Sequence, residues 1–270
     1  MDYFRPLGKI PYIVDETESY AVVYKPPLIF SAPLGRVFEV TLLGWYARHC
    51  PKVLDLAGNK KEEGGLLHRL DFETEGLVLF AKTQGAYESL RSQQEAGDFV
   101  KEYLAISCPP SREGGGLLPG FPPPPVTGPS LAGSPGACIE SFFRPWGPGR
   151  RAVRPVTAPG KRLKIAGDRG KPYRTEILSC KDLGAVSGIP GGEGPRVFGL
   201  RIRRGFRHQI RCHLAWIGEP VLCDTLYGGQ GGPPAPANGW EKRPIGLRAW
   251  AFRFFDPGTG EQKDYRLPSF

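Results

Sequence analysis

Asp71 is the residue whose type and surroundings point most directly to chemistry. It lies in a polar stretch, with His68 and Arg69 before it and Lys82 after it. A carboxylate held near a guanidinium stays ionised and can be oriented, as a nucleophile or a general base must be. Without the other motifs, the alternative interpretation is that Asp71 is an ordinary surface aspartate in a turn. The other motifs of the chain must decide between these interpretations.

Two further places carry groups that could contact a base or a phosphate. Tyr103 falls inside an expected strand, where an aromatic side chain usually belongs to the core, although tyrosines that stack on bases are common in RNA-binding proteins. The run 207–211 (RHQIR) opens an expected helix, where side-chain donors coincide with the positive end of the helix dipole. Its ordinary alternative is a capped and solvated first turn.

Other familiar chemistries lack their sequence signatures. Cys212 and His213 are neighbours on an expected helix, so their side chains point apart and do not predict a thiolate pair. The chain has no HExxH motif, no phosphate loop and no dinucleotide fingerprint. Its four histidines and six scattered cysteines show no metal-ligand spacing. We therefore expect no metal site, and reduced thiols such as a cytoplasmic protein carries.

The positive charge of the chain is concentrated in one stretch. The net charge is +9, yet residues 140–211 hold 17 lysines and arginines against 5 acidic residues, and the remainder carries −3. A basic surface of this kind favours a polyanionic partner, with nucleic acid first. A solvated basic face that keeps the protein soluble is the alternative.

The elements that must position these residues predict an α+β fold. Hydrophobic periodicity and turn residues indicate helices at 41–50, 83–97 and 208–217. Strands are expected at 11–16, 20–25, 66–67, 77–82, 99–107, 173–178, 196–204 and 247–254, with a short last strand after the turn at 256–258. Because strands outnumber helices and several are joined by tight turns, we expect a mixed, largely antiparallel sheet flanked by helices and loops.

Two segments rich in glycine and proline interrupt this pattern, at about 109–136 and 184–195. We expect each to bury little apolar surface and to form an extended loop or linker; a proline-recognition ligand is the alternative for the first. No apolar run is long enough to span a bilayer, and the N-terminus does not resemble a secretory signal.

Taken together, the motifs resemble the RluA family of RNA pseudouridine synthases. Residues 68–82 (HRLDFETEGLVLFAK) are similar to that family's HRLDxxTSGLLLxAK signature. Residues 101–105 (KEYLA) are similar to its KxYxA strand, and 205–228 to its GRTHQIRxHLxxxGxPIxGDxxYG block. Residues 24–26 (YKP) resemble its NKP turn. The resemblance covers most of the chain in the right order.

The resemblance implies an isomerase that turns uridine in rRNA or tRNA into pseudouridine. Asp71 would be the catalytic aspartate, attacking the ribose C1′ or assisting formation of a glycal. Tyr103 would lie against the flipped base and help to remove the C5 proton, and Arg211 would pair with Asp71. Arg69 would enter the space that the flipped base leaves. Flipping is needed because a stacked uridine hides both its C1′ bond and its C5 edge.

The resemblance also sets the remaining expectations. His68, Arg207, His208 and Gln209 would contact RNA, together with the basic segment Arg144–Arg174. Residues 1–270 would form a single catalytic domain, with an active-site cleft across the sheet and no S4 RNA-binding domain before it. No cofactor, metal or membrane is implied. A cytoplasmic monomer is the default.

Three residues depart from the family pattern: Glu75 stands at a usual serine, Phe206-Arg207 replaces Arg-Thr, and Tyr173 occupies a position where small residues are common. The first two border the expected site. They support an alternative, an RNA-binding protein that has kept the fold and lost catalysis. A general RNA hydrolase is a weaker third hypothesis, since it needs a second acid–base group or a metal that the sequence does not offer.

Overall fold

Two compact units make up the described chain. The computed structural model describes residues 6–33, 40–108, 118–124, 135–157, 170–184, 194–229 and 243–269. The first unit contains the described residues up to Glu102, together with 243–244 and 248–269; the second contains those from Tyr103 to Gly229 together with Ile245–Leu247. The chain passes from the first unit into the second within strand β4 (Val100–Ser107).

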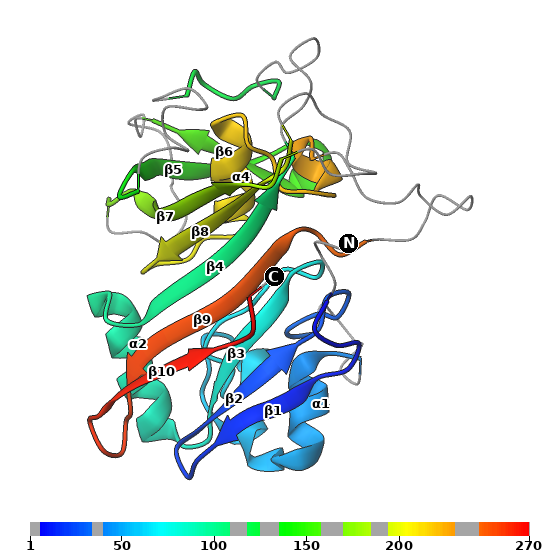
Figure 1. Ribbon diagram of the computed structural model, residues 1–270. Helices are drawn as coiled ribbons and strands as arrows, with labels where there is room; N and C mark the ends of the chain where they lie inside the picture. Colours follow the sequence, from blue (N-terminus) through cyan, green and yellow to red (C-terminus); the bar gives the residue numbers. More distant parts are fainter. Residues whose placement is uncertain are drawn as a thin grey trace. The chain divides into compact units, whose positions relative to one another are not determined.

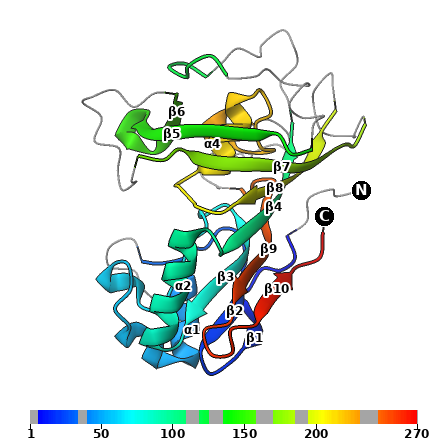
Figure 2. The same ribbon diagram turned by 90° about the vertical axis from the view of Figure 1, so that its left-hand side faces the viewer.

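The first unit is a sheet with helices on one face. Its strand order is β1 (Tyr12–Glu16), β2 (Tyr20–Lys25), β3 (Glu75–Ala81) and β9 (Leu247–Phe255), and β10 (Gln262–Arg266) pairs with β9. All of these neighbours are antiparallel except β3 and β9, which are parallel. Figure 2 shows helices α1 (Leu42–His49) and α2 (Gln84–Ala96) on the same side of the sheet. Every residue of β2 and β3 is buried, so these strands form the centre of the core.

Both helices of the first unit begin at the threonines that the sequence indicated. The side chain of Thr41 accepts a hydrogen bond from Gly44 N at 3.0 Å, and that of Thr83 accepts one from Ala86 N at 3.2 Å. Such N-caps satisfy donors that the first helical turn leaves unpaired. Gly97, with a φ of 88°, ends α2 in the left-handed conformation.

The second unit is an antiparallel sheet with one described helix of eight residues. Its strands follow the order β8 (Arg196–Ile202), β7 (Tyr173–Asp182), β5 (Cys138–Trp146) and β6 (Ala152–Val156) (Figure 1). Helix α4 (Gln209–Trp216) packs against β6 and β7. The described 3-10 turns of both units are η1 (Pro51–Asp55), η2 (Lys61–Glu63), η3 (Pro148–Arg150) and η4 (Thr225–Tyr227).

The predicted α+β class with a largely antiparallel sheet is confirmed, and so are the three predicted helices. Two strands were missed, β5 and β6, in the region that the sequence marked only as basic. The strand expected at 66–67 is wrong, because Leu66 forms only an isolated bridge with Phe80. No helix of the described residues is long and apolar enough to cross a membrane.

The expectation for the first glycine- and proline-rich segment needs correction at residues 118–124. Phe121 is 92 % buried there and meets the ring of Trp146 edge-on, with the centroids 5.7 Å apart. The indole N–H of Trp216 donates to the carbonyl of Pro122 at 2.8 Å. This stretch therefore packs within the second unit and buries an aromatic side chain. Residues 109–117, 125–134 and 185–193 lie outside the described residues.

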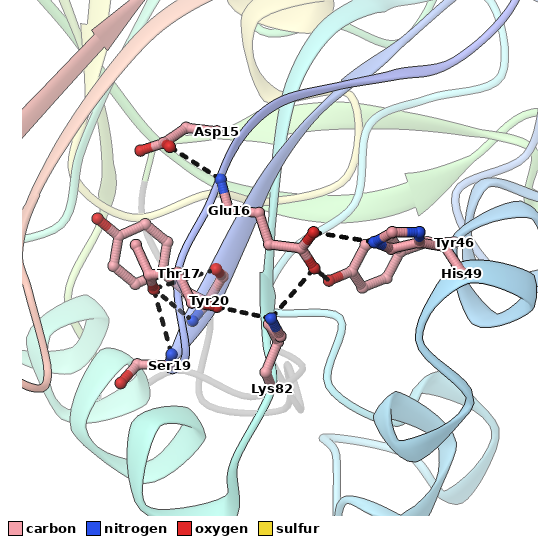
Figure 3. Close-up of polar contacts among 8 residues, drawn as sticks. All are labelled: Asp15, Glu16, Thr17, Ser19, Tyr20, Tyr46, His49 and Lys82. Atoms are coloured by element: carbon pink, nitrogen blue, oxygen red, sulfur yellow. Dashed lines mark hydrogen bonds and ion pairs between the residues drawn. The ribbon is translucent and has the colours of Figure 1, made fainter.

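Lys82 has a different position from the one its sequence neighbourhood suggests. Asp71 precedes β3 and Lys82 follows it, so a seven-residue strand separates them, roughly 23 Å of extended chain. Figure 3 shows Lys82 fastened to the β1–β2 turn instead: its Nζ lies 3.2 Å from Glu16 Oε1 and donates to the carbonyl of Thr17 at 2.6 Å. Tyr46 and His49 of α1 contact the same Glu16 carboxylate, at 2.8 and 2.9 Å. Lys82 thus helps to join α1 to the sheet.

Candidate active site

The loop that carries Asp71 is held by hydrogen bonds on both sides of that residue. Ser31 Oγ donates to the carbonyl of Leu70 at 2.9 Å and accepts from its N–H at 3.0 Å. On the other side, the carbonyl of Phe72 accepts from Leu28 N at 2.7 Å. Asp71 itself is half-buried. Its backbone is therefore fixed while its side chain keeps access to the surface, as a group that must meet a ligand requires.

A fully buried lysine accompanies this loop. Lys25, the last residue of β2, has no exposed surface, and its Nζ donates to the carbonyl of Pro26 at 3.0 Å and lies 3.5 Å from that of Phe72. Burial lowers the pKa of Lys25 to about 7, and the negative charges of Asp71, Glu73 and Glu75 oppose that shift. The Asp71 loop thus has a buried, titratable cation within electrostatic reach.

Glu75, the first departure from the family pattern, is a buried structural carboxylate. Its Oε1 accepts from Arg248 Nε at 2.8 Å, and both side chains are about 99–100 % buried. Its Oε2 accepts from the hydroxyl of Tyr24 at 2.5 Å and from Leu7 N at 3.1 Å. Arg248 also donates to the carbonyl of Pro268 at 3.0 Å. Every oxygen of this carboxylate therefore has a partner, as a buried charge needs.

The parallel contact between β3 and β9 explains why a glycine follows Glu75. Glu75 lies opposite Arg248 in the register, and Gly76 lies opposite Ala249. Gly76 has a φ of 135°, and a Cβ at this position would lie 2.3 Å from the carbonyl oxygen of Ala249. Any side chain there would push the strands apart and open the ion pair.

His68 is a neutral, packed imidazole. Its ring lies 5.5 Å from that of Phe99, and its Nε2 is 3.4 Å from the carbonyl of Leu77. Burial, with a smaller contribution from Lys101, lowers the pKa of His68 to about 3. Part of the residue stays exposed, but its Nδ1 is buried and has no hydrogen-bond partner among the described residues. The predicted contact of His68 with RNA stays a prediction.

Arg69 lies on the surface next to Asp71. Its Nη1 is 2.9 Å from Glu63 Oε1, and 46 % of its side chain is exposed. The Glu63 carboxylate is only 8 % exposed, so the ion pair is half-buried and holds the guanidinium on one side. The rest of the Arg69 side chain lies at the surface, and its predicted entry into a base stack stays a prediction.

Arg211 forms a buried, two-pronged ion pair with Asp224. Its Nε donates to Asp224 Oδ2 at 2.7 Å and its Nη2 to Oδ1 at 2.8 Å. The two side chains are 4 % and 1 % exposed. The guanidinium also lies over the ring of Tyr227, 5.5 Å from its centroid. This pair fixes the orientation of Arg211 within the second unit; the predicted pairing of Arg211 with Asp71 is not tested by it and stays a prediction.

The residues before Arg211 face the protein interior more than the sequence suggested. His208 has a left-handed φ of 55°, and its Nδ1 lies 3.1 Å from the hydroxyl of Tyr227. Gln209 is 98 % buried; its Nε2 donates to the carbonyl of Arg174 at 2.8 Å, and its Oε1 accepts from Phe206 N at 2.9 Å. Both side chains have partners that hold the start of α4 in place. Their proposed contacts with RNA stay untested.

Arg207 and Tyr103 differ in their exposure. Arg207 is exposed, and its Nη2 donates to the carbonyls of Arg150 at 2.9 Å and Ala152 at 3.1 Å. Tyr103 lies in β4 and is 94 % buried. A buried tyrosine has both a ring face and a hydroxyl to offer, so its burial is compatible with a core role and with a role beside a flipped base.

The other two departures from the family pattern pack against each other. The rings of Phe206 and Phe143 are stacked, with centroids 5.0 Å apart and planes at 8°. Tyr173 lies 5.0 Å from Phe206 and 5.7 Å from Phe143. The large residue at 173 therefore has a large aromatic partner at 206. Packing between their rings therefore explains why both Phe206 and Tyr173 depart from the family pattern.

Three residues that shape the site were not singled out from the sequence. Lys25 stood within the YKP motif, and a lysine closing a wholly apolar strand was the available signal. Asp224 stood in the block that ends at Gly228, without an assigned partner. Arg248 could not be linked to Glu75, because 173 residues separate them. Among the described residues, no group of three or more His, Cys, Asp or Glu could hold a metal ion.

Comparison with known proteins defines the class. The family model described as RNA pseudouridylate synthase matches residues 19–216, most of the chain. The chain therefore belongs to the RNA pseudouridylate synthase family. Its fold is also similar to that of human RNA pseudouridylate synthase domain containing 1, with a TM-score of 0.58 at 19% identity, over 96% of this chain and 84% of that one.

Among individual relatives, the chain is 26% identical over 262 residues to the ribosomal large subunit pseudouridine synthase D of Vibrio vulnificus, covering 95% of this chain and 66% of that protein. It is 26% identical over 271 residues to the protein of the same name from Pasteurella multocida, covering 98% and 69%. The chain thus spans about two thirds of the length of these curated relatives.

Proposed function

We propose that the chain is an RNA pseudouridine synthase, an isomerase that converts specific uridines of rRNA or tRNA to pseudouridine. The observation that carries this proposal is the Asp71 loop. In a chain of this family, the aspartate of the HRLD motif lies on a backbone fixed by Ser31 and Leu28 and within electrostatic reach of the buried Lys25. Relatives named for the ribosomal large subunit favour rRNA as the substrate.

The proposed reaction rearranges one bond and conserves all atoms. The C1′–N1 bond of the uridine breaks, the detached uracil turns, and a C1′–C5 bond forms. The proton on C5 then leaves and N1 ends with a proton, so no redox step, metal or cofactor is required. Asp71 either attacks C1′ to form an ester or assists formation of a glycal; both routes need its ionised carboxylate.

Tyr103 and Arg211 complete the proposed catalytic set. Tyr103 would lie against the flipped uracil and help to remove the C5 proton, and Arg211 would pair with Asp71 and keep it ionised. Asp71 belongs to the first unit and the other two residues to the second. Their cooperation on one uridine is therefore proposed from the family relationship alone.

The RNA contacts are assigned to the surroundings of these groups. Arg69 and Arg207 are exposed and can reach phosphates or an opened base stack. His68, His208 and Gln209, which are held within the protein, would shape the surface that meets the RNA. We further propose that the protein acts as a cytoplasmic monomer; none of its six cysteines is paired in a disulfide, as a reducing compartment favours.

The alternative of an inactive RNA-binding protein loses its specific support. It rested on Glu75 and Phe206, and each of these has a structural explanation. Glu75 is neutralised by Arg248, and Phe206 stacks on Phe143 beside Tyr173. Neither departure removes Asp71, Tyr103 or Arg211.

Release of the C5 proton tests the proposal in the test tube. RNA transcripts of rRNA and tRNA labelled with tritium at uridine C5 are incubated with the wild-type chain and with Asp71→Asn. We expect the wild-type protein to release tritium and Asp71→Asn to release none while binding the RNA equally well. Binding without release by the wild-type protein would support the inactive alternative.

A further inference from the structure

Seven arginines of the second unit lie on two segments that contain no acidic residue. The β5–β6 hairpin, residues 144–157, and the turn between β8 and α4, residues 203–208, lack both aspartate and glutamate. We call these arginines the arginine platform: Arg144, Arg150, Arg151, Arg154, Arg203, Arg204 and Arg207. Figure 1 shows β5, β6 and α4 together in the second unit.

One arginine joins the two segments. Arg207 Nη2 donates to the carbonyls of Arg150 and Ala152, at 2.9 and 3.1 Å. It therefore fixes the tip of the β5–β6 hairpin to the start of α4. One guanidinium nitrogen is used for this tie, and the exposed side chain keeps its charge at the surface. Arg207 acts in this arrangement as a positioning residue for Arg150 and its neighbour Arg151.

Two members of the platform oppose each other directly. Arg144 and Arg154 are cross-strand partners in the β5–β6 register. Like charges in such positions destabilise a hairpin. Arg154 Nη1 donates to the carbonyl of Gly120, but a carbonyl does not neutralise the pair. The hairpin therefore carries an electrostatic cost that an anion bound between the two guanidinium groups would relieve.

The arginines elsewhere in the described part of the second unit have carboxylate partners. Arg174 lies 2.7 Å from Glu140, Arg201 3.7 Å from Glu176, and Arg211 is paired with Asp224. Arg144, Arg150 and Arg151 are all exposed, and none of them forms an ion pair with a carboxylate of the described residues. The charges of Arg144, Arg150 and Arg151 are thus not neutralised by a carboxylate of the described residues, whereas those of Arg174, Arg201 and Arg211 are.

Aromatic side chains accompany the unneutralised charge. Trp146 is half-buried and lies two residues from Arg144, on the same face of β5. Phe206 is also half-buried, next to Arg207. Cations interleaved with partly exposed aromatic rings suit a nucleic acid strand, whose phosphates meet the former and whose bases stack on the latter.

We propose that the arginine platform binds the phosphate backbone of the RNA substrate, with Arg207 holding the β5–β6 hairpin in its binding position. This inference rests on the proposed function for the identity of the RNA. Contacts of this kind set position and affinity without reading sequence, so they confer a strong dependence on salt.

The test compares two double variants that remove the same charge. Arg144→Gln/Arg150→Gln alters the platform, and Lys52→Gln/Lys60→Gln removes two exposed cations of the first unit. Binding of a synthetic mixed-sequence RNA hairpin is measured over a series of KCl concentrations. If the two arginines contact two phosphates, the slope of log K against log salt falls by about 1.5. The lysine variant should keep the wild-type slope.

Arg207→Lys provides a second variant that keeps the charge but replaces the planar guanidinium that makes the tie with a shorter side chain ending in an ammonium. We expect Arg207→Lys to weaken binding of the RNA hairpin at low salt several-fold. The slope of log K against log salt should change less than in Arg144→Gln/Arg150→Gln. Equal slopes for the platform variant and the wild type, or equal losses in the two double variants, would overturn the proposal.

Tritium release by the wild-type protein separates this proposal from the proposed function. If the wild-type protein releases tritium but the platform variants bind RNA with the wild-type salt dependence, the platform proposal fails and the proposed function stands. If the platform variants change the salt dependence but the wild-type protein releases no tritium, the proposed function fails and the platform proposal stands. If the wild-type chain does not bind the RNA hairpin, the platform proposal is refuted as well.

Discussion

Arg248 and Glu75 form a buried ion pair between two parallel strands, with Arg248 Nε 2.8 Å from Glu75 Oε1. Tyr24 and Leu7 complete the coordination of the carboxylate. The pair lies where the Asp71 loop enters β3, so it anchors the end of the loop that carries the proposed catalytic group. A residue that departs from the family pattern thus stabilises the site from within the core.

Glu75→Ser, which restores the usual family residue, should destabilise the protein strongly. It leaves the buried Arg248 without its counter-charge, which costs about 3–5 kcal/mol. Glu75→Ser/Arg248→Met should recover a large part of that loss. The free energy of unfolding from urea titrations measures both. A serine variant as stable as the wild type would show that the ion pair is not needed.

Asp224→Asn should reduce catalysis more than RNA binding. The amide cannot accept both hydrogen bonds of Arg211, so the guanidinium loses its fixed orientation and its buried counter-charge. We expect kcat to fall about 100-fold while KM changes little, if Arg211 acts on the reacting groups. Asp224→Glu, which keeps the charge, serves as the control. Equal losses in RNA affinity and in kcat would assign the pair a purely structural role.

Because of the buried Lys25, we expect the free energy of unfolding to rise with pH above neutrality. Burial lowers its folded-state pKa to about 7, whereas the unfolded chain keeps an ordinary lysine near 10.5. Between these values the unfolded state binds a proton that the folded state does not, so this contribution to stability increases with pH from about 7 upward. Its slope approaches about 1.4 kcal/mol per pH unit.

Comparing the wild type with Lys25→Met isolates the contribution of Lys25 to the pH dependence of the free energy of unfolding. Unfolding titrations at several pH values between about 7 and 9 should show a stability difference that grows in favour of the wild type as pH rises. The exposed Lys181→Met serves as the control and should run parallel to the wild type. Parallel curves for Lys25→Met would mean that Lys25 stays fully charged in the fold.

His213 gives a pH dependence of the same sign, but in the acid range. It is fully buried between Ser141 and Thr175, at 2.9 and 2.8 Å, and burial lowers its pKa to about 3. Below about pH 6.5 the unfolded chain binds a proton at this residue and the folded chain does not, so stability is lost as the pH falls from 6.5 towards 3. His213→Gln should flatten that loss. An unchanged acid limb in unfolding titrations would contradict the assignment.

The local elements could be predicted from the sequence because their signals are local. Thr41 and Thr83 mark helix starts through caps to residues three positions ahead, and the apolar run of β3 is continuous. The β5–β6 hairpin escaped prediction because Pro145 and the arginines at 144 and 154 break the alternation of a strand.

The partners of the candidate site residues could not be predicted, because they are set by tertiary structure. The HRLD and HQIR motifs identified Asp71 and Arg211, but nothing near them in sequence showed that Arg211 binds Asp224 or that Glu75 is buried against Arg248. Lys82 is a further example. It belongs to the same sequence signature as Asp71, but it lies at the far end of β3 and forms an ion pair with Glu16 at the β1–β2 turn.

Pseudouridine formation at a defined RNA position, dependent on Asp71, is the most direct consequence of the proposed function. A carbodiimide-based map of pseudouridine in total RNA compares cells lacking this protein with cells that regain the wild-type chain or Asp71→Asn. We expect one or a few rRNA or tRNA positions to lose the modification and to regain it only with the wild-type chain. Recovery with Asp71→Asn, or no position that depends on the protein, would contradict the assignment of Asp71 as the catalytic carboxylate of an RNA pseudouridine synthase.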